Sequence, residues 1–203
     1  CCPTEERLVR AYLGGRGLNI KRLWDELPAH TPGLSPHNLL AFGAGPLVGT
    51  LFPGGARFNV SAMSPQTGIL GDSNAGGFFA SELRYAGYDQ VIIRGRAERP
   101  VYLLIRDDRV ELRDARGVWG RDVWEASQAI RAEVGDPDTQ VATIGPAAEN
   151  GVLFAGVFCS LNRPAARTGM GAVMASKNLK AVAVRGTGTI RPADMPHFQE
   201  IIA

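Results

Sequence analysis

The stretch of residues 57–86 contains the residues that are best suited to bind an anion. An apolar–polar alternation predicts a strand at its start, and Asp72-Ser73-Asn74 combines three residue types that favour a helix N-cap. Gly76 and Gly77 follow, and residues 78–83 then form a helical run. Such a helix end exposes backbone N–H groups with a partial positive charge, and glycine lets a ligand approach the backbone. An ordinary capped helix after a hairpin is the alternative interpretation.

Arginines accompany this stretch and a later one. Arg57 stands at the head of the predicted strand, where its planar guanidinium could bind a phosphate through two N–H groups. Arg163 and Arg167 enclose the second segment, 163–167. Solvated surface arginines are the alternative for this second pair, and an internal repeat favours the binding interpretation.

Three landmarks recur in the same order in two parts of the chain. They are a Gly-Pro pair after an apolar run, a G-x-x-x-A-S pattern and an Arg-Gly pair after a strand, beginning at Gly45, Gly76 and Arg94, and again at Gly145, Gly171 and Arg185. We therefore predict two related repeats, roughly 38–97 and 139–188, each with a glycine-flanked helix N-terminus. A duplicated anion cradle would suit a ligand with two equivalent anionic arms, or two copies of one phosphorylated ligand.

Few other residues suggest chemistry. The cysteines Cys1, Cys2 and Cys159 fit neither a disulfide framework nor a zinc or cluster motif, and His30 and His37 are isolated in a Pro-rich loop. A formal charge of +2 without a Lys/Arg run argues against nucleic acid, and no apolar stretch is long enough to span a membrane. We expect a cytoplasmic protein with no nucleic-acid or membrane partner. The absent initiating Met and the apolar end suggest a piece of a longer protein, or a processed subunit.

The elements that position these residues predict an α+β fold, a β-rich single domain over residues 1–203 with helices flanking mixed sheets, because strands run in groups between few helices. Besides the helices above, helical patterns cover 5–13, 18–27 and 119–134. Strand patterns cover 38–43, 91–94, 101–106, 110–113, 140–144, 152–158 and 182–184. The GGRGL segment at 14–18 lacks the preceding strand and the glycine order of a dinucleotide site.

Several ordered motifs resemble the N-terminal domain of the tungsten-dependent aldehyde ferredoxin oxidoreductases. They are AGPLVGT at 44–50, GARFNV at 55–60, SPQTG at 64–68, SNAGGFFASELRYAGYD at 73–89, IGPAAEN at 144–150 and GAVMASKNLKA at 171–181. The match extends from about Leu13 to about Gly186, nearly the whole chain. Together these motifs are far more specific than any one of them.

The resemblance implies a cofactor in which two molybdopterin-type ligands hold one tungsten (or molybdenum) atom, with a magnesium ion bridging their phosphates. Carried over by motif, the residues that would contact this cofactor are Arg57, Asn74, Ala75 and Gly76 in the first half, and Arg163, Pro164, Ala165 and Ala166 in the second. The backbone carbonyls of Asn74 and Pro164 would bind the magnesium, which prefers oxygen ligands. Two related halves agree with two pterins.

The second half departs from the family pattern R-A-A-G-R-G-G. Pro164 removes a backbone donor but keeps the carbonyl, while Ala166 and Thr168 replace glycines, as does Ala148 in the A-G-E-N motif. A positive φ or a very close ligand approach is therefore not expected at these three positions. We expect the second site to bind its pterin less tightly or in an altered geometry.

The resemblance further implies that this chain is the cofactor-binding part of an enzyme that oxidises aldehydes to carboxylates. Electrons would pass through a [4Fe–4S] cluster to ferredoxin. The cluster ligands and the acid/base residues would lie beyond residue 203, in the same protein or in a partner subunit, so no catalytic residue is assigned here. A non-catalytic anion- or pterin-binding module with the same fold is the alternative, and nucleotide binding is a distant third. The aldehyde, the metal and the oligomeric state, a homodimer included, stay open.

Overall fold

Two β-sheets form the body of the protein, and the computed structural model describes them within residues 2–160 and 162–203, so Cys1 lies outside the described part. The first sheet has the order β3-β2-β1-β4 and the second β6-β5-β10-β7-β8-β9. The strands are β1 (Leu40–Ala44), β2 (Phe58–Met63), β3 (Leu70–Ala75), β4 (Gln90–Ile93), β5 (Val101–Arg106), β6 (Arg109–Asp114), β7 (Gln140–Thr143), β8 (Val157–Cys159), β9 (Arg163–Ala165) and β10 (Leu179–Arg185). The helices are α1 (Glu6–Tyr12), α2 (Gly15–Glu26), α3 (Phe79–Tyr85), α4 (Val123–Val134), α5 (Pro146–Glu149), α6 (Met170–Ser176) and α7 (Met195–Ile202). Every strand pairing is antiparallel except that of β5 with β10.

The two sheets contain the same four-stranded unit. The order β3-β2-β1-β4 corresponds to β9-β8-β7-β10, and in both units a helix, α3 or α6, joins the third strand to the fourth. The hairpin β5–β6 then extends the second sheet beside β10. The predicted α+β fold with two related repeats is therefore confirmed, whereas the repeat limits 38–97 and 139–188 stay a prediction.

Strand registers identify equivalent residues in the two units. Phe42 pairs with Val60 and Val91, and Ala142 pairs with Cys159 and Val182. This correspondence brings the two Gly-Pro landmarks and the two Arg-Gly landmarks into equivalent places. The predicted equivalence of the two G-x-x-x-A-S patterns is wrong. Residues 76–81 lead into α3 and form its first turn, whereas residues 171–176 lie within α6 and end at its last residue.

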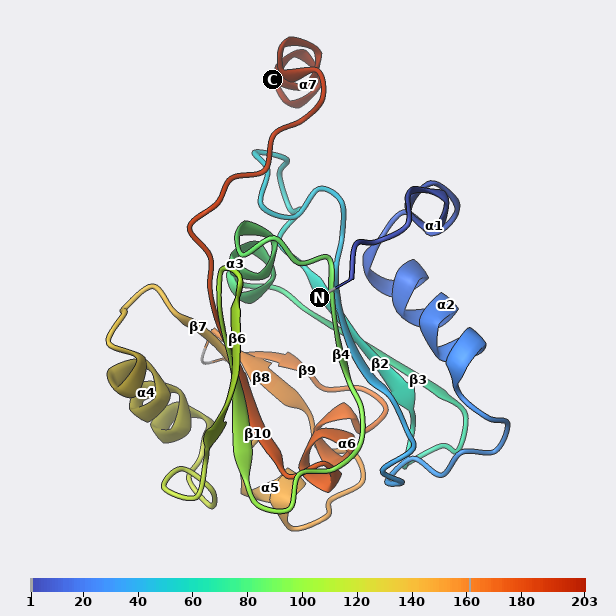
Figure 1. The fold of residues 1–203 in the computed structure, drawn as a ribbon, viewed down its shortest axis with the longest axis vertical. Coiled ribbons are helices and arrows are strands. Elements are labelled where there is room, and N and C mark those ends of the chain that lie inside the picture. The colour runs from blue at the N-terminus through green and yellow to red at the C-terminus, as the bar shows by residue number, and fades with distance from the viewer. Residues whose placement is uncertain (1, 161) are drawn as a thin grey trace.

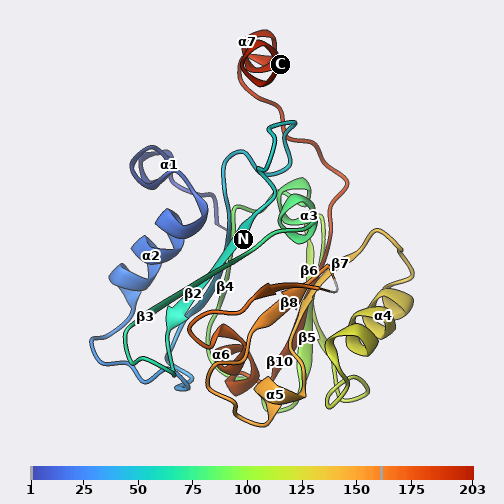
Figure 2. The ribbon, with the colours of Figure 1, turned by 180° about the vertical axis from the view of Figure 1, so that it is seen from behind.

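Helices alternate with the sheets as layers (Figures 1 and 2). α2 contacts β1 and β2, whereas α3 and α6 contact strands of both sheets and α4 contacts β7. One hydrophobic core joins the sheets through α3 and α6, and Phe58 and Phe79 pack there with ring centroids 4.9 Å apart. A smaller core lies under α4. α7 stands apart from the sheets at the end of the chain (Figure 1).

The local sequence explains most element boundaries, with three corrections. Helix α4 begins at Val123 rather than at residue 119, because Asp122 Oδ1 accepts a hydrogen bond from Glu125 N at 2.8 Å and caps the helix. Helix α2 begins at Gly15, before the predicted residue 18. The predicted strand 152–158 is reduced to β8, because backbone hydrogen bonds such as Ala155 N to Val152 O fold the preceding residues into turns. None of the helices in the described residues has the length and apolar character that crossing a membrane requires.

Candidate functional site

Strands β3 and β9 occupy equivalent edges of the two sheets and contact each other. Two clefts lie at their junction. The first, about 620 Å³ and here called the Asn74 cleft, is lined by Arg16, Asp72, Ser73, Asn74, Pro164, Ala166 and Arg167. The second, about 510 Å³ and called the Arg57 cleft, is lined by Gly54, Ala56, Arg57, Gly76, Gly77, Phe78, Ser160, Asn162 and Arg163. Each cleft combines residues of one edge strand with the residues that follow the other edge strand, so the repeat relates the two clefts.

The backbone carbonyl of Asn74 points away from its own sheet. Pairs in an antiparallel ladder alternate between hydrogen-bonded and non-hydrogen-bonded. Ser64 N donates to Ile69 O at 2.9 Å, and the alternation from this pair makes Asn59–Asn74 a non-hydrogen-bonded pair. Because β3 is an edge strand, the N–H and C=O of Asn74 have no partner strand on their own side.

The carbonyl of Pro164 points outward for a related reason. Pro164 lies opposite Phe158 in the pairing of β9 with β8, and β9 is an edge strand. The registers make Pro164 the equivalent of Asn74. Proline has no N–H to donate, so on an edge strand it occupies positions whose backbone groups face away from the partner strand. Asn74 and Pro164 both line the Asn74 cleft, and carbonyl oxygens without sheet partners are hard donors of the kind that suits a cation such as magnesium.

The Arg57 cleft is basic. Arg57 precedes β2 and Arg163 begins β9, and neither guanidinium pairs with a carboxylate among residues 2–160 and 162–203. Gly76 leaves the cleft open, because a Cβ at this position would have as its nearest neighbour Ala56 O, at 3.9 Å. The cleft thus offers two free guanidinium groups beside accessible backbone, which suits a phosphate.

The Asn74 cleft contains a carboxylate as well as arginines. Arg16 Nη2 lies 2.7 Å from Asp72 Oδ2, whereas the Arg167 side chain has no carboxylate partner in the described part of the chain. The backbone N–H of Arg167 donates to Ser73 Oγ at 3.0 Å and joins the second repeat to β3. Sequence reasoning treated Asp72 as part of a helix cap and assigned no role to Arg16. The GGRGL segment was the only part of the sequence analysis that drew attention to Arg16. Its ion pair with Asp72 could not be predicted, because the two residues are distant in sequence.

The two helix ends that were predicted as anion cradles differ from each other in the structure. Asp72-Ser73-Asn74 belongs to β3 instead of capping a helix, and α3 begins at Phe79 without a side-chain cap. At α6 the glycines serve packing: a Cβ on Gly169 would lie 1.9 Å from Leu153 O, and one on Gly171 would lie 2.3 Å from Gly156 O. Gly171 N also donates to Ala155 O at 2.8 Å. The start of α3, at Gly76, Gly77 and Phe78, lines the Arg57 cleft together with Arg57 and Arg163, whereas Gly169 at the start of α6 lines neither cleft.

The remaining residues assigned by motif differ in accessibility. Ala75 and Ala165 are buried and line neither cleft, whereas Ala166 lines the Asn74 cleft. Thr168 adopts a φ of 59° despite its side chain, which corrects the expectation that the loss of glycine excludes a positive φ there. Its carbonyl accepts from Ser64 Oγ at 2.8 Å, a contact that holds this conformation. Ala148 and Ala166 are not among the residues with positive φ.

No metal site built from side chains accompanies these clefts. In the residues that the structure describes, no group of three or more His, Cys, Asp or Glu could hold a metal ion. Cys159 is buried, donates to Gly76 O at 3.1 Å, and burial raises the pKa of its thiol to about 12. It is therefore a protonated structural thiol beneath the Arg57 cleft rather than a nucleophile or ligand.

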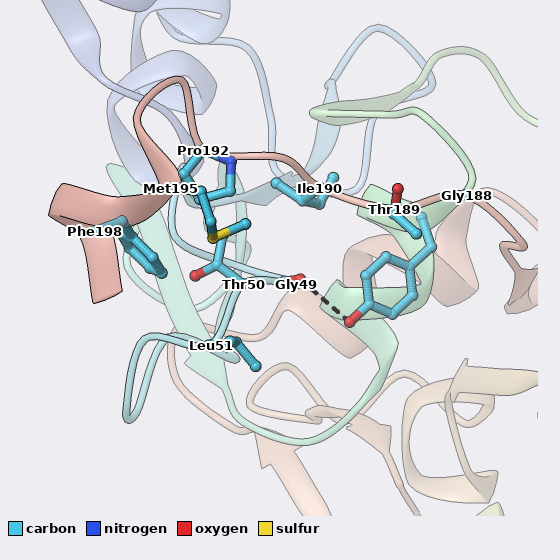
Figure 3. Close-up of a pocket in the computed structure, with 10 residues that line it drawn as sticks. Gly49, Thr50, Leu51, Gly188, Thr189, Ile190, Pro192, Met195 and Phe198 are labelled. Atoms are coloured by element: carbon cyan, nitrogen blue, oxygen red, sulfur yellow. Dashed lines mark hydrogen bonds between the residues drawn. The ribbon is translucent and has the colours of Figure 1, made fainter. Parts of the chain in front are cut away.

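A third hollow of about 290 Å³ lies between the end of α3 and the C-terminal segment (Figure 3). Leu51, Ile190, Met195 and Phe198 line it, and Tyr85 Oη donates to Gly49 O at 3.3 Å. None of its lining residues carries a charge at neutral pH, so it lacks the means to bind an anion.

Comparisons with known proteins agree on one family. The family model for the aldehyde ferredoxin oxidoreductase N-terminal domain matches residues 2–186. The tungsten-containing aldehyde ferredoxin oxidoreductase of Pyrococcus furiosus is 46% identical over 198 residues, which cover 98% of this chain and 33% of that protein. The WOR-like subunit of the aliphatic sulfonate oxidoreductase of the same organism is 38% identical over 200 residues, covering 91% of this chain and 32% of that protein.

A solved structure resembles the chain equally closely. The active-site complex BamBC of benzoyl coenzyme A reductase, bound to 1,5-dienoyl-CoA, contains a chain that is 44% identical and superposes with a TM-score of 0.97. The superposition covers 99% of the present chain and 31% of that chain. The chain thus spans about a third of the length of the relatives that it matches.

Proposed function

Because this chain belongs to the aldehyde ferredoxin oxidoreductase family, we propose that it binds the phosphate arms of a bis-pterin tungsten cofactor within a longer oxidoreductase. The relatives named tungsten-containing support the metal, with molybdenum as the alternative. The observation that carries the proposal is the junction of β3 and β9. There, two outward carbonyls from equivalent strands stand beside two arginine-bearing clefts that the repeat relates.

The residues present fit such a ligand. Arg57 and Arg163 would bind one pterin phosphate, and Arg16 and Arg167 would neutralise the other. The carbonyls of Asn74 and Pro164 would hold a magnesium ion shared by the two phosphates, since Mg²⁺ commonly combines a few protein oxygens with phosphates and water. Gly76 and Ala166 would shape the surface that the pterins meet, and the buried Ala75 and Ala165 would support that surface from beneath.

The chain contributes binding and orientation to the reaction. When bound, the tungsten centre would supply the oxidation of an aldehyde to a carboxylate, with electrons leaving through a [4Fe–4S] cluster to ferredoxin. We place the cluster and the acid/base residues in the remaining domains or in a partner subunit. By neutralising the phosphates on a rigid two-sheet base, this chain would fix the position of the cofactor relative to those parts.

The experiment is a cofactor analysis of the full-length protein, purified without oxygen from cells supplied with tungstate. We expect tungsten (or molybdenum), magnesium and a pterin that fluoresces after oxidation. Arg57→Ala should lower pterin retention about tenfold, the effect of losing one or two charged hydrogen bonds at an exposed site. The matched control is Arg99→Ala, which removes an exposed arginine remote from both clefts.

Two results would contradict the proposal. Wild-type protein free of both metal and pterin would instead support a binding module that keeps the fold without the cofactor. Equal retention in Arg57→Ala and Arg99→Ala would remove Arg57 from the phosphate site.

A further inference from the structure

A series of hydrogen-bonded side-chain amides runs from Gln90 on β4 through Asn19 on α2 to Asn59 on β2, toward the Asn74 cleft. Gln90 Nε2 donates to Asn19 Oδ1 at 2.7 Å, and Asn19 Nδ2 donates to Asn59 Oδ1 at 2.9 Å. Asn19 is 0% exposed and Asn59 is 2% exposed. Burying a side-chain amide costs free energy unless the amide is hydrogen-bonded. The hydrogen bonds of this series therefore fix the orientation of the Asn19 and Asn59 side chains.

The last member of this series, Asn59, holds the edge strand β3. Its Nδ2 group donates to Asn74 Oδ1 at 3.2 Å, to Ser73 O at 3.3 Å and to Asp72 Oδ1. All three acceptors belong to consecutive residues of β3, and Asn59 lies directly opposite Asn74 in the register. Side chains approach most closely in such non-hydrogen-bonded pairs. One amide therefore fastens the edge strand at the residue whose carbonyl faces outward.

The second repeat solves the same problem differently. Phe158 occupies the position equivalent to Asn59, opposite Pro164. The proline ring fixes φ, so the backbone of Pro164 needs no polar restraint. Asn74 has no such ring, and neither Ser73 nor Ala75 beside it is a proline that would restrict the backbone of β3. The amide of Asn59 supplies the restraint that the ring supplies in the other repeat.

We propose that Asn59 is a positioning residue for the cation site, holding β3 so that the Asn74 carbonyl stands beside that of Pro164. The inference rests on the proposed function, because it concerns the magnesium expected between those carbonyls. Partners of this kind, which orient metal ligands without touching the metal, commonly contribute 10–100-fold to metal affinity.

The test measures how much magnesium the full-length holoprotein needs to keep its pterin. Samples are dialysed without oxygen against a series of EDTA-buffered Mg²⁺ concentrations, and the retained pterin is quantified by fluorescence after oxidation. Asn59→Ala should raise the midpoint concentration about tenfold. Ser61→Ala is the matched control: Ser61 is buried on the same face of β2 and donates to Asn59 Oδ1 at 2.6 Å, but it makes no hydrogen bond to β3. Its midpoint should stay within about twofold of wild type, because the three donations into β3 remain.

A general loss of stability would lower the melting temperature without moving the magnesium midpoint, so both are recorded. Equal midpoints for Asn59→Ala and Ser61→Ala would overturn the positioning role, while loss of pterin in Arg57→Ala would still support the proposed function. Wild-type holoprotein that retains pterin, contains no magnesium and ignores EDTA would overturn the positioning role and the magnesium site, but would leave the proposed binding of the pterin in place. If Asn59→Ala does not accumulate, Asn74→Ala removes one acceptor at an exposed side chain. Its midpoint should rise about threefold, and an unchanged midpoint would contradict the inference.

Discussion

The two clefts at the β3–β9 junction share a backbone plan but differ in charge. Arg57 and Arg163 give the Arg57 cleft a formal charge of +2, whereas Arg16, Arg167 and Asp72 give the Asn74 cleft +1. In addition, Arg16 is already paired with Asp72. Duplication of the unit has therefore preserved strand order and carbonyl direction, while the electrostatics of the two halves have diverged. An anionic arm in the Arg57 cleft would meet the stronger attraction.

The supports beneath the clefts differ as well. An amide, Asn59, stands opposite the outward carbonyl of the first repeat, and an aromatic ring, Phe158, stands opposite that of the second. The backbone geometry can be retained by either device, because a hydrogen-bonded amide and a proline both restrict an edge strand. The comparison teaches that equivalent positions in a repeat need equivalent backbone restraint, not equivalent side chains.

The largest expected effect separates two glycines near the β3–β9 junction: Gly169, which precedes α6, and Gly76, which lines the Arg57 cleft. Gly169→Ala should lower the local unfolding free energy of α6 by about 3 kcal/mol, because φ is +75° and the new Cβ would lie 1.9 Å from Leu153 O. Gly76→Ala should change local stability by less than about 0.5 kcal/mol, since its Cβ would make only an ordinary contact with Ala56 O at 3.9 Å. Native-state hydrogen exchange of α3 and α6 in the full-length protein measures both. Similar exchange in the two variants would show that the glycines are equivalent after all.

The next effect concerns charge. Replacing Arg57 and Arg163 together with Ala should accelerate pterin release from the holoprotein about 100-fold, since each lost charged hydrogen bond costs at least about 1.5 kcal/mol. Replacing Arg16 and Arg167 together should accelerate it only about tenfold, because Arg16 is shared with Asp72. Release is followed by fluorescence after dilution. Equal acceleration by the two double variants would mean that the clefts contribute alike.

A smaller effect should bring the clefts closer together. Asp72→Asn keeps an oxygen that can accept the hydrogen bond from Asn59, but it removes the carboxylate that pairs with Arg16. The formal charge of the Asn74 cleft then rises to +2, which equals that of the Arg57 cleft. We expect pterin release to slow about threefold at low ionic strength, the effect of one nearby partly solvated charge. At 1 M salt, where the Debye length is about 3 Å, the difference should vanish. Faster release at low salt would indicate that Asp72 holds the cofactor rather than weakening its binding.

The smallest effect concerns the thiol under the Arg57 cleft, which has no counterpart under the Asn74 cleft. At pH 8 iodoacetamide should label the exposed Cys2 and leave Cys159 unmodified until the protein unfolds, because burial raises the pKa of Cys159 to about 12 and its thiol stays protonated. Because the pKa of Cys159 is raised in the folded protein, this thiol begins to favour unfolding only when the pH exceeds the usual pKa of a thiol. The labelling of Cys159 should therefore stay unchanged between pH 7 and 8. Mass spectrometry of the native protein measures the modification. Rapid native labelling of Cys159 would show that the cleft floor opens.

The repeat could be predicted because it depends on short signals that survive divergence. The Gly-Pro and Arg-Gly landmarks mark strand ends, and the registers place them at equivalent positions. The alternation of Phe58, Val60 and Ala62 likewise predicted β2, because one face of that strand is buried. In contrast, β3 was missed: its residues favour turns and caps by themselves, and only pairing with β2 makes them a strand.

Periodicity, turn residues and motif order were enough to predict the fold class and the duplication, and to single out the candidate arginines Arg57, Arg163 and Arg167. Only the tertiary structure decided where the charge lies. The glycines of α6 proved to serve close packing, and Arg16 found Asp72 across the chain. Only the sheet registers turned the Asn74 and Pro164 carbonyls outward at one cleft. The physical reason is that propensities act over a few residues, whereas hydrogen-bond parity and ion pairing arise between segments that are distant in sequence.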